Sequence, residues 1–228
     1  MFPNLARYQE KFVTNIFATL QMVLISGIFS FVIGLIIGII LSITSSGGIK
    51  ENKIIHTIIS VLINILRAVP FIILLVVLIP FTRSLVGTSI GVKGAIVPLV
   101  FGTVPFYSRQ VESSLLNIDS GKIEAARSMG SSTIGLIFRV YLYESVPELI
   151  RVTTITAISL VGLTAMAGAV GAGGLGDFAI NYGQGLGSWD IVWACVIVLM
   201  IIISVIQALG SILAKLSTNK KIFNKKIK

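Results

Sequence analysis

Long uncharged stretches alternate with short charged segments along this chain of 228 residues. No charged residue occurs between Lys11 and Lys50, and four further apolar runs follow. A helix needs roughly 20 apolar residues to cross the hydrocarbon core of a bilayer. The pattern therefore predicts five membrane-spanning helices, at about residues 16–43, 56–80, 90–109, 149–168 and 190–214.

Arg67 is the only charged residue that falls clearly inside a predicted span, because Lys93 and Arg109 can extend to the headgroups at the ends of the third span. A charge at the centre of a span costs roughly 2.5–3.5 kcal/mol on insertion scales, so such a residue is a candidate functional residue. Three placements are open for Arg67: facing a translocation pathway, pairing at a subunit boundary, or lying near the cytoplasmic end where Pro70 breaks the helix.

The composition agrees with this pattern and excludes several kinds of chemistry. Hydrophobic residues make up 55% of the chain, charged residues make up 12%, and the mean hydropathy is +0.98. These values indicate an all-α integral membrane protein, which we expect to form one domain over residues 1–228. Cys195 is the only cysteine and His56 the only histidine, so an internal disulfide and a cysteine-rich metal site are excluded. We expect no catalytic residue, no metal and no cofactor, and we expect His56 to lie in a solvated loop.

The distribution of Lys and Arg predicts the orientation. Cations gather in the connections after the first and third spans and in the C-terminal tail, and cytoplasmic segments carry such an excess. We therefore expect the N-terminus outside and the C-terminus in the cytoplasm. The net charge of +9 follows from this topology, and nothing in the sequence points to nucleic acid. The cations concerned are Lys50, Lys53, Arg109, Lys122, Arg127, Arg139, Arg151, Lys215, Lys220, Lys221, Lys225, Lys226 and Lys228.

The segment Gly171–Gly176, GAGGLG, matches the G-x-G-x-x-G spacing of a dinucleotide-binding loop. That fingerprint requires a preceding strand, a following helix and an acidic residue about twenty positions later. Here the segment follows a predicted span, and Asp190 precedes another one. We interpret the segment as a flexible external turn or gate between the fourth and fifth spans, without a role in nucleotide binding.

The longest polar connection, about residues 110–146, contains clear signals for helix ends. Asp119 or Ser120 can cap a short helix at about residues 121–129, and Gly130 suits the left-handed position that ends it. The sequence therefore predicts a short helix outside the membrane between the third and fourth spans.

The second half of this connection predicts another helix and a separate start for the fourth span. Ser131 or Ser132 can begin the second loop helix. Residues 145–148, Ser-Val-Pro-Glu, form a capping-box pattern directly before the apolar run.

At this connection the chain resembles a family. The segment Glu124–Gly130, EAARSMG, is followed after nine residues by Val140, Tyr141 and Leu142. It resembles the EAA loop of ABC importer permeases, whose pattern is E-A-A, three residues, G, nine residues and I-x-L-P. Val140 replaces the isoleucine, and Tyr143 replaces the proline.

The resemblance extends from about Leu20 to Leu213. The segments Phe71–Gly91, FIILLVVLIPFTRSLVGTSIG, and Ala165–Phe178, AMAGAVGAGGLGDF, are similar to the methionine-import permeases of this family, which have five spans. The resemblance implies a bacterial plasma-membrane protein that is not itself an enzyme. The implied partners are a second copy of this permease, two cytoplasmic ATP-binding subunits and an external substrate-binding lipoprotein, and the implied cargo is methionine or a similar amino acid.

The resemblance also assigns ATPase coupling to Glu124, Ala125, Ala126 and Gly130. Small side chains let a helix lie closely in the groove of another protein, and Glu124 stands in the first turn, where the helix dipole favours an acid. The alternative is an amphipathic helix that lies along the membrane surface.

Two spans carry distinctive small and hydroxyl-bearing residues. The ladder of Ser26, Ser30, Gly34, Gly38 and Ser42 in the first span predicts close helix packing. The fourth span is rich in hydroxyl groups, which makes it the best candidate to line a pathway. With Arg67, the pathway or gate candidates are Thr156, Ser159 and Met166.

Two other classes of function are alternatives to the ATP-driven importer. A secondary transporter or channel usually carries an acid or histidine inside a span, whereas all nine acids here fall in predicted loops, span ends or the N-terminal segment. An intramembrane enzyme would need a catalytic constellation that the sequence lacks. The sequence therefore favours the permease subunit of an ATP-driven importer that works by alternating access, and the alternative is an ATP-independent secondary amino-acid transporter or channel.

Overall fold

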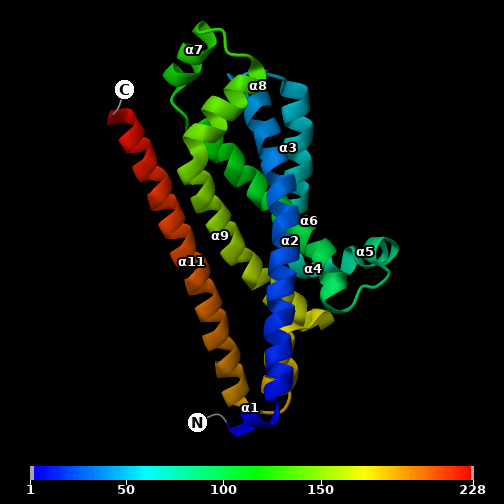
Figure 1. Ribbon diagram of the computed structural model, residues 1–228. Coiled ribbons are helices and arrows are strands. Elements are labelled where there is room, and N and C mark those ends of the chain that lie inside the picture. Colours follow the sequence, from blue (N-terminus) through cyan, green and yellow to red (C-terminus); the bar gives the residue numbers. More distant parts are fainter. Residues whose placement is uncertain (1–2, 227–228) are drawn as a thin grey trace.

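The computed structural model describes residues 3–226, and these residues form helices joined by short connections, with no strand among them (Figure 1). This agrees with the predicted all-α class. The α-helices are α1 (Pro3–Arg7), α2 (Gln9–Thr44), α3 (Lys53–Ala68), α4 (Phe71–Val77), α5 (Ile79–Val86), α6 (Gly91–Leu116), α7 (Ser120–Ser128), α8 (Thr133–Leu136), α9 (Tyr143–Ala167), α10 (Gly174–Phe178) and α11 (Trp189–Lys226). Three π-helical segments join some of them: η1 (Ile137–Leu142), η2 (Gly168–Ala172) and η3 (Ala179–Gln184).

Three helical runs of the described chain are long and apolar enough to cross a membrane: Gln9–Thr44, Thr133–Ala172 and Trp189–Thr218. The remaining apolar segments are two bent pairs, α3 with α4 at 101° and α5 with α6 at 119°. The number of spans is therefore three, or up to five when each bent pair is counted as one span. The segment expected at about 56–80 is thus not one straight helix.

The bend between α3 and α4 has a local cause. Val69 is extended, at φ −78° and ψ 121°, and Pro70 follows it. A residue before proline avoids the helical region, and proline offers no N–H to continue the helix. The second bend contains two glycines with positive φ, Gly87 at 79° and Gly91 at 73°. As a result α5 projects sideways from the bundle in Figure 1, whereas α4 stays packed against it through Leu74 and Leu75.

The ladder of small residues predicted in the first span is buried and packs as expected. Gly34 lies against the ring of Tyr107 on α6, and a Cβ at Gly34 would come within 2.8 Å of that ring. A Cβ at Gly38 would come within 2.6 Å of the Val111 side chain and 2.8 Å of the Ser108 carbonyl oxygen. The two helices therefore approach each other more closely than any larger residue would allow.

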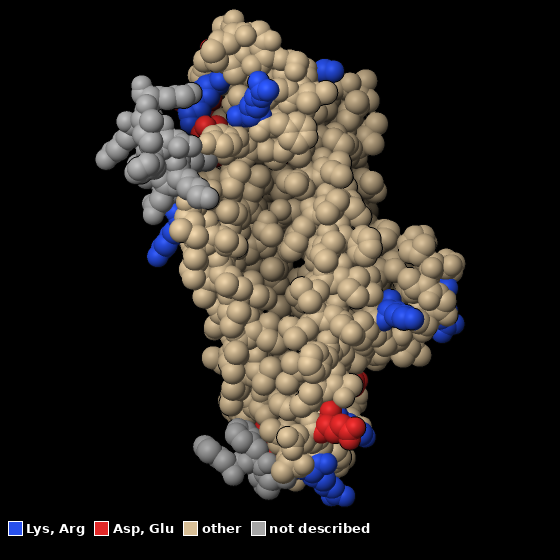
Figure 2. Space-filling view, in the orientation of Figure 1, with Lys and Arg blue, Asp and Glu red and all other residues tan. Residues whose placement is uncertain are grey.

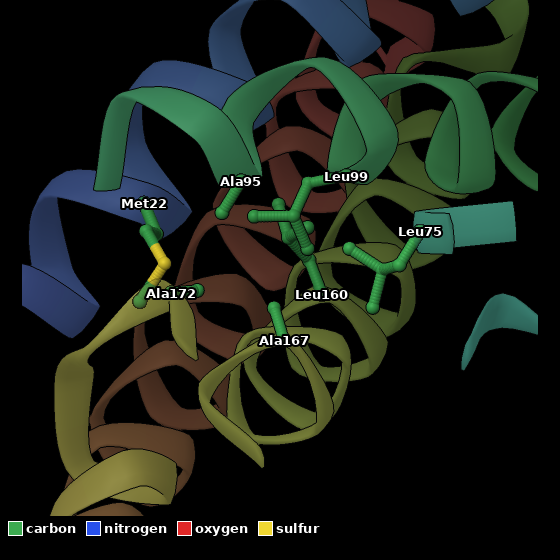
Figure 3. Packing of buried hydrophobic residues seen from close by; sticks show 7 residues of the cluster. All are labelled: Met22, Leu75, Ala95, Leu99, Leu160, Ala167 and Ala172. Atoms are coloured by element: carbon green, nitrogen blue, oxygen red, sulfur yellow. The ribbon is translucent and has the colours of Figure 1, made fainter. Parts of the chain in front are cut away.

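A central apolar cluster joins four helices with η2 (Figure 3). Leu99 and Leu160 are its fully buried leucines, and they bring α6 and α9 together. Met22 reaches from α2 toward Ala172, as Figure 3 shows. The cluster is made of Met22, Leu75, Ala95, Leu99, Leu160, Ala167 and Ala172.

Most charged side chains gather at the two ends of the molecule and on its lateral projection; on the face in Figure 2 the surface between them is uncharged except for one cationic side chain at the left margin. One end, here called the α7 end, holds α7, α8 and the C-terminus (Figure 1). The opposite end holds α1 and is here called the α1 end. Arg83 on α5 and Lys93 on α6 belong to the lateral part, and of the tail lysines Lys228 lies outside the described residues.

We expect Gly38→Ala to lower the free energy of unfolding by about 1–3 kcal/mol, because the added methyl group meets the backbone of α6, which cannot move aside cheaply. Gly27→Ala is the matched control on the same helix, since its Cβ would meet only side-chain atoms, at 3.5 and 3.6 Å. Unfolding of the purified protein in mixed micelles measures both. Equal stability of the two variants would contradict the packing described here.

Candidate functional site

The short helix predicted in the long polar connection is present as α7, with the expected ends. The Asp119 carboxylate oxygen accepts a hydrogen bond from the Gly121 N–H at 2.9 Å, which caps the helix. Gly130 follows the helix with φ 77°, the left-handed conformation predicted for it. Ser132 caps α8 by accepting a hydrogen bond from the Gly135 N–H at 3.2 Å.

The four predicted coupling residues do not share one environment. Glu124, Ala125 and Gly130 are exposed, whereas Ala126 is only 7% exposed and packs against the rest of the chain. Met129 is 79% exposed at the end of α7. Sequence reasoning did not single out Met129, because one apolar residue in a polar connection gives no signal of its exposure.

The α7 helix is tied to the long helices by one ion pair and one apolar contact. The Lys122 ammonium lies 2.7 Å from a carboxylate oxygen of Glu144 on α9. Ile123 packs against a second buried cluster, which contains Tyr107, Val111, Leu115, Tyr141 and Val152. The Tyr107 hydroxyl is within hydrogen-bonding distance of the Thr153 hydroxyl, at 2.7 Å, which connects α6 with α9 inside this cluster.

The predicted separate start of the fourth span is wrong. The chain is helical without interruption from Thr133 to Ala167, with the π-helical η1 leading directly into α9. Pro147 lies inside α9, one turn beyond η1. The Ser145 hydroxyl donates to the Ser114 carbonyl oxygen on α6 at 3.3 Å, so it links two helices in place of capping one.

A cavity of about 420 Å³ lies between α3, α4, α6 and α9. Three of the four predicted pathway residues line it together: Arg67 from α3, and Thr156 and Ser159 from α9. Met166 does not line it and lies on α9 two turns beyond Ser159, where it is 38% exposed. The other lining residues are Leu66, Val69, Pro70, Phe71, Leu74, Gly102, Thr103, Phe106, Leu160 and Leu163.

The polar groups of this cavity are few and incompletely paired. Arg67 makes no hydrogen bond or ion pair with any residue that the structure describes. The Thr103 hydroxyl is buried and has no hydrogen-bond partner among the described residues. The Thr156 hydroxyl donates to the Val152 carbonyl oxygen at 2.8 Å, which leaves its own oxygen free to accept.

The glycine segment Gly171–Gly176 is packed, which corrects its interpretation as a flexible turn. The Gly174 N–H donates to the Asn15 side-chain oxygen at 2.9 Å, and the Leu175 N–H donates to the Thr19 hydroxyl at 2.8 Å. Glycine is needed because the chain turns with positive φ at Gly173 and Gly174 while lying directly on α2.

Asp190, the acid nearest to the position that a nucleotide fingerprint requires, links the N-terminal helix α1 to the start of α11. One carboxylate oxygen accepts from the Asn4 backbone N–H and the other from the Asn4 side chain, both at 3.0 Å. The carboxylate thus joins α1 to α11, and a nucleotide role is not needed to explain it.

A buried charged cluster joins α3 to α6, and sequence reasoning missed it. Glu112 is 6% exposed within α6, where a loop was expected. One of its oxygens lies 2.7 Å from the Arg109 guanidinium and the other 3.1 Å from the His56 ring. His56 therefore lies on a helix in contact with an acid, not in a solvated loop. Arg109 also donates to the Ser60 carbonyl and Asn64 side-chain oxygens, both at 3.3 Å.

Residues 34–221 match the protein family described as "Binding-protein-dependent transport system inner membrane component". The matched residues include α7 and all four helices that line the cavity.

Two similar proteins extend this match over most of the chain. The probable D-methionine transport system permease protein MetI of Pasteurella multocida (strain Pm70) is 46% identical over 197 residues, which are 86% of this chain and 91% of that protein. The methionine import system permease protein MetP of Bacillus subtilis (strain 168) is 44% identical over 176 residues, 77% of this chain and 79% of that protein.

Solved structures agree with the sequence comparisons. The chain is similar, with a TM-score of 0.90 and 43% identity, to a chain in the structure titled "Inward facing conformations of the MetNI methionine ABC transporter: CY5 SeMet soak crystal form"; the match covers 92% of this chain and 98% of that one. The structure titled "Crystal structure of an amino acid ABC transporter with histidines" matches with a TM-score of 0.77 at 18% identity, which is a likeness in fold alone.

We expect Glu112→Ala to lower the free energy of unfolding by roughly 1–3 kcal/mol, because it leaves the half-buried Arg109 guanidinium without its anion. Glu148→Ala is the control: it removes an acid whose pair with Arg151 is solvent-exposed, with 45% and 62% of the two side chains accessible, so its effect stays below about 1 kcal/mol. Denaturation of the two purified variants in mixed micelles measures their free energies of unfolding. Equal decreases would mean that the buried Glu112 cluster stabilises the fold no more than an exposed ion pair does.

Proposed function

This chain belongs to the family of binding-protein-dependent transport system inner membrane components, and from this membership we propose that it is the permease subunit of an ATP-driven ABC importer for methionine. The observation that carries the proposal is the likeness to a chain of the MetNI methionine ABC transporter over 92% of the sequence. The relatives in Pasteurella multocida and Bacillus subtilis, both named for methionine transport, support the same cargo. The chain itself then performs no chemistry, and ATP is hydrolysed by a separate subunit.

The proposed assembly contains two copies of this permease, two cytoplasmic ATP-binding subunits and an external substrate-binding lipoprotein. Within each permease we count five spans by taking each bent pair, α3–α4 and α5–α6, as one. With five spans the ends of the chain lie on opposite sides of the membrane. The excess of Lys and Arg in the segments of the α7 end supports a cytoplasmic position for that end and an external one for the α1 end.

The α7 helix is proposed as the coupling helix that receives force from the ATP-binding subunit. Its exposed residues Glu124, Ala125 and Gly130 form the contact surface, and Met129 adds a large apolar side chain to it. Ala126 has a different role, since it seats the helix against its own chain.

Movement of α7 is transmitted to the spans through contacts with the long helices. The Lys122–Glu144 ion pair connects α7 to α9, and Ile123 contacts the cluster that joins α6 and α9. Shifting a gate from 1:99 to 99:1 needs about 5.5 kcal/mol of differential binding energy. The closure of an ATP-binding pair supplies this energy from outside the permease.

The cavity between α3, α4, α6 and α9 is proposed as part of the translocation pathway, lined by Arg67, Thr156 and Ser159. Met166 is proposed as a contact nearer the outer end of the pathway, because α9 continues from Ser159 toward the packed glycine segment. Alternating access then consists of opening this cavity first to the outside and afterwards to the cytoplasm.

One observation favours the alternative of an ATP-independent secondary transporter. Glu112 and His56 form a buried acid–histidine contact inside the helical bundle, of the kind that proton-coupled transporters use. Arg109, however, lies 2.7 Å from the same carboxylate, so the acid is already paired with a permanent cation. Uptake by liposomes that contain this chain alone tests the alternative: the importer requires that no methionine accumulates against a gradient.

We expect Met129→Asp to weaken association with the ATP-binding subunit by roughly tenfold or more, because a charge replaces an exposed apolar anchor. Substitution of Gly130 would be less informative, since its φ of 77° disfavours other residues. Copurification of the subunit and substrate-stimulated ATP hydrolysis measure the loss. Lys50→Asp, at an exposed site in the neighbouring α2–α3 connection, is the control, and a similar loss there would remove α7 from the coupling role.

The proposed orientation predicts which cysteines a membrane-impermeant maleimide reaches in intact cells. In a Cys195→Ser background, whose own cysteine is buried, Arg7→Cys becomes labelled from outside. Lys50→Cys becomes labelled only after the membrane is permeabilised. The reverse pattern would invert the topology.

A further inference from the structure

We propose that the cavity between α3, α4, α6 and α9 is a binding site within the membrane for a zwitterionic amino acid with an apolar side chain, and that Arg67 binds its carboxylate. The inference rests on the proposed function, because it assigns a chemical preference to the pathway of the importer. It adds a recognition site in the permease itself to the selection made by an external binding protein.

Among the residues that the structure describes, Arg67 is the only charged one that lines the cavity. It stands in the last turn of α3, directly before the bend at Val69 and Pro70, and therefore in the middle of the α3–α4 span. Its side chain is exposed, and its guanidinium forms no ion pair with any residue that the structure describes. A carboxylate is the ligand that it binds best, through two parallel N–H···O bonds.

Thr103 supplies an independent observation on the opposite wall. The residue is 2% exposed, and its hydroxyl has no hydrogen-bond partner among the described residues. Buried hydroxyl groups are normally paired, and of the five unpaired ones among the described residues only that of Thr103 belongs to a residue lining this cavity. A small rotation of the Thr103 side chain brings its hydroxyl to the carboxylate of a bound amino acid, and the exposed Ser159 hydroxyl lines the same cavity.

The remaining wall is apolar. Phe71, Leu74, Phe106, Leu160 and Leu163 surround the polar groups, and Leu160 also belongs to the packed cluster in Figure 3. The volume of about 420 Å³ lies within the range of small-molecule sites. No carboxylate lines the cavity, so it cannot neutralise a cationic side chain. The site therefore selects an apolar side chain together with a free carboxylate.

The test uses the complex of this permease with its ATP-binding subunit in nanodiscs, without the external binding protein. Saturation binding of radiolabelled methionine is measured, with methionine amide and lysine as competitors. We expect methionine to bind, the amide to compete at least tenfold less well than unlabelled methionine, and lysine not to compete. The amide keeps the side chain and the ammonium group and lacks only the carboxylate charge.

Four variants distinguish recognition by Arg67 from a general effect of its charge. We expect Arg67→Gln to weaken methionine binding at least tenfold and to abolish the preference over the amide. Arg67→Lys retains the preference with weaker binding, and Thr103→Val weakens binding severalfold. Arg83→Gln is the control. Arg83 lies on α5 outside the cavity and donates a hydrogen bond to the Ser89 hydroxyl at 3.0 Å, so methionine binding stays unchanged.

Each variant is first checked for assembly with the ATP-binding subunit, so that misfolding is recognised; the Arg67→Lys and Thr103→Val variants test the site if Arg67→Gln does not assemble. The inference is overturned if methionine and its amide bind equally to the unsubstituted complex, or if the assembled Arg67 and Thr103 variants bind methionine normally. Failure of the proposed function gives a different result, namely a permease that does not assemble with an ATP-binding subunit at all.

Discussion

The close contact of α2 with α6 is the constraint on which the rest of the bundle depends. In a membrane, helices gain little from burying apolar side chains, because lipid is equally apolar, so close packing of small residues must hold them together. Gly34 and Gly38 provide this contact against Tyr107 and Val111. The position of Tyr107 then fixes α9 through the Thr153 hydroxyl, and α9 carries one wall of the cavity.

The sequence predicted the elements whose signals are local. The ends of α7 follow from Asp119 and Gly130, because capping and left-handed glycine involve neighbouring residues only. The buried ladder on α2 follows from a simple spacing of small residues. Arg67, Thr156 and Ser159, singled out as the charge inside a span and as hydroxyl groups of the fourth span, line one cavity.

The features that were missed or mistaken depend on contacts between distant residues. From the sequence, Glu112 is expected in a loop. In the structure α6 continues to Leu116 and brings Glu112 into contact with His56, 56 residues away in the sequence. Ser145 matches a capping pattern, yet the chain enters α9 already helical, so the hydroxyl bonds Ser114 instead. The glycine segment suggests flexibility from composition alone, whereas α2 holds it through Asn15 and Thr19.

The hydrogen bonds between α2 and the glycine segment form late in biosynthesis. Asn15 and Gly174 are bonded although 159 residues separate them, and Thr19 and Leu175 are 156 residues apart. While the ribosome is still making the intervening chain, the first helix to leave the translocon carries these polar side chains without their final partners. The packing of the earliest helix is therefore completed only after Gly174 and Leu175 have been made, and a nascent chain that stops before Gly174 leaves that helix without this contact.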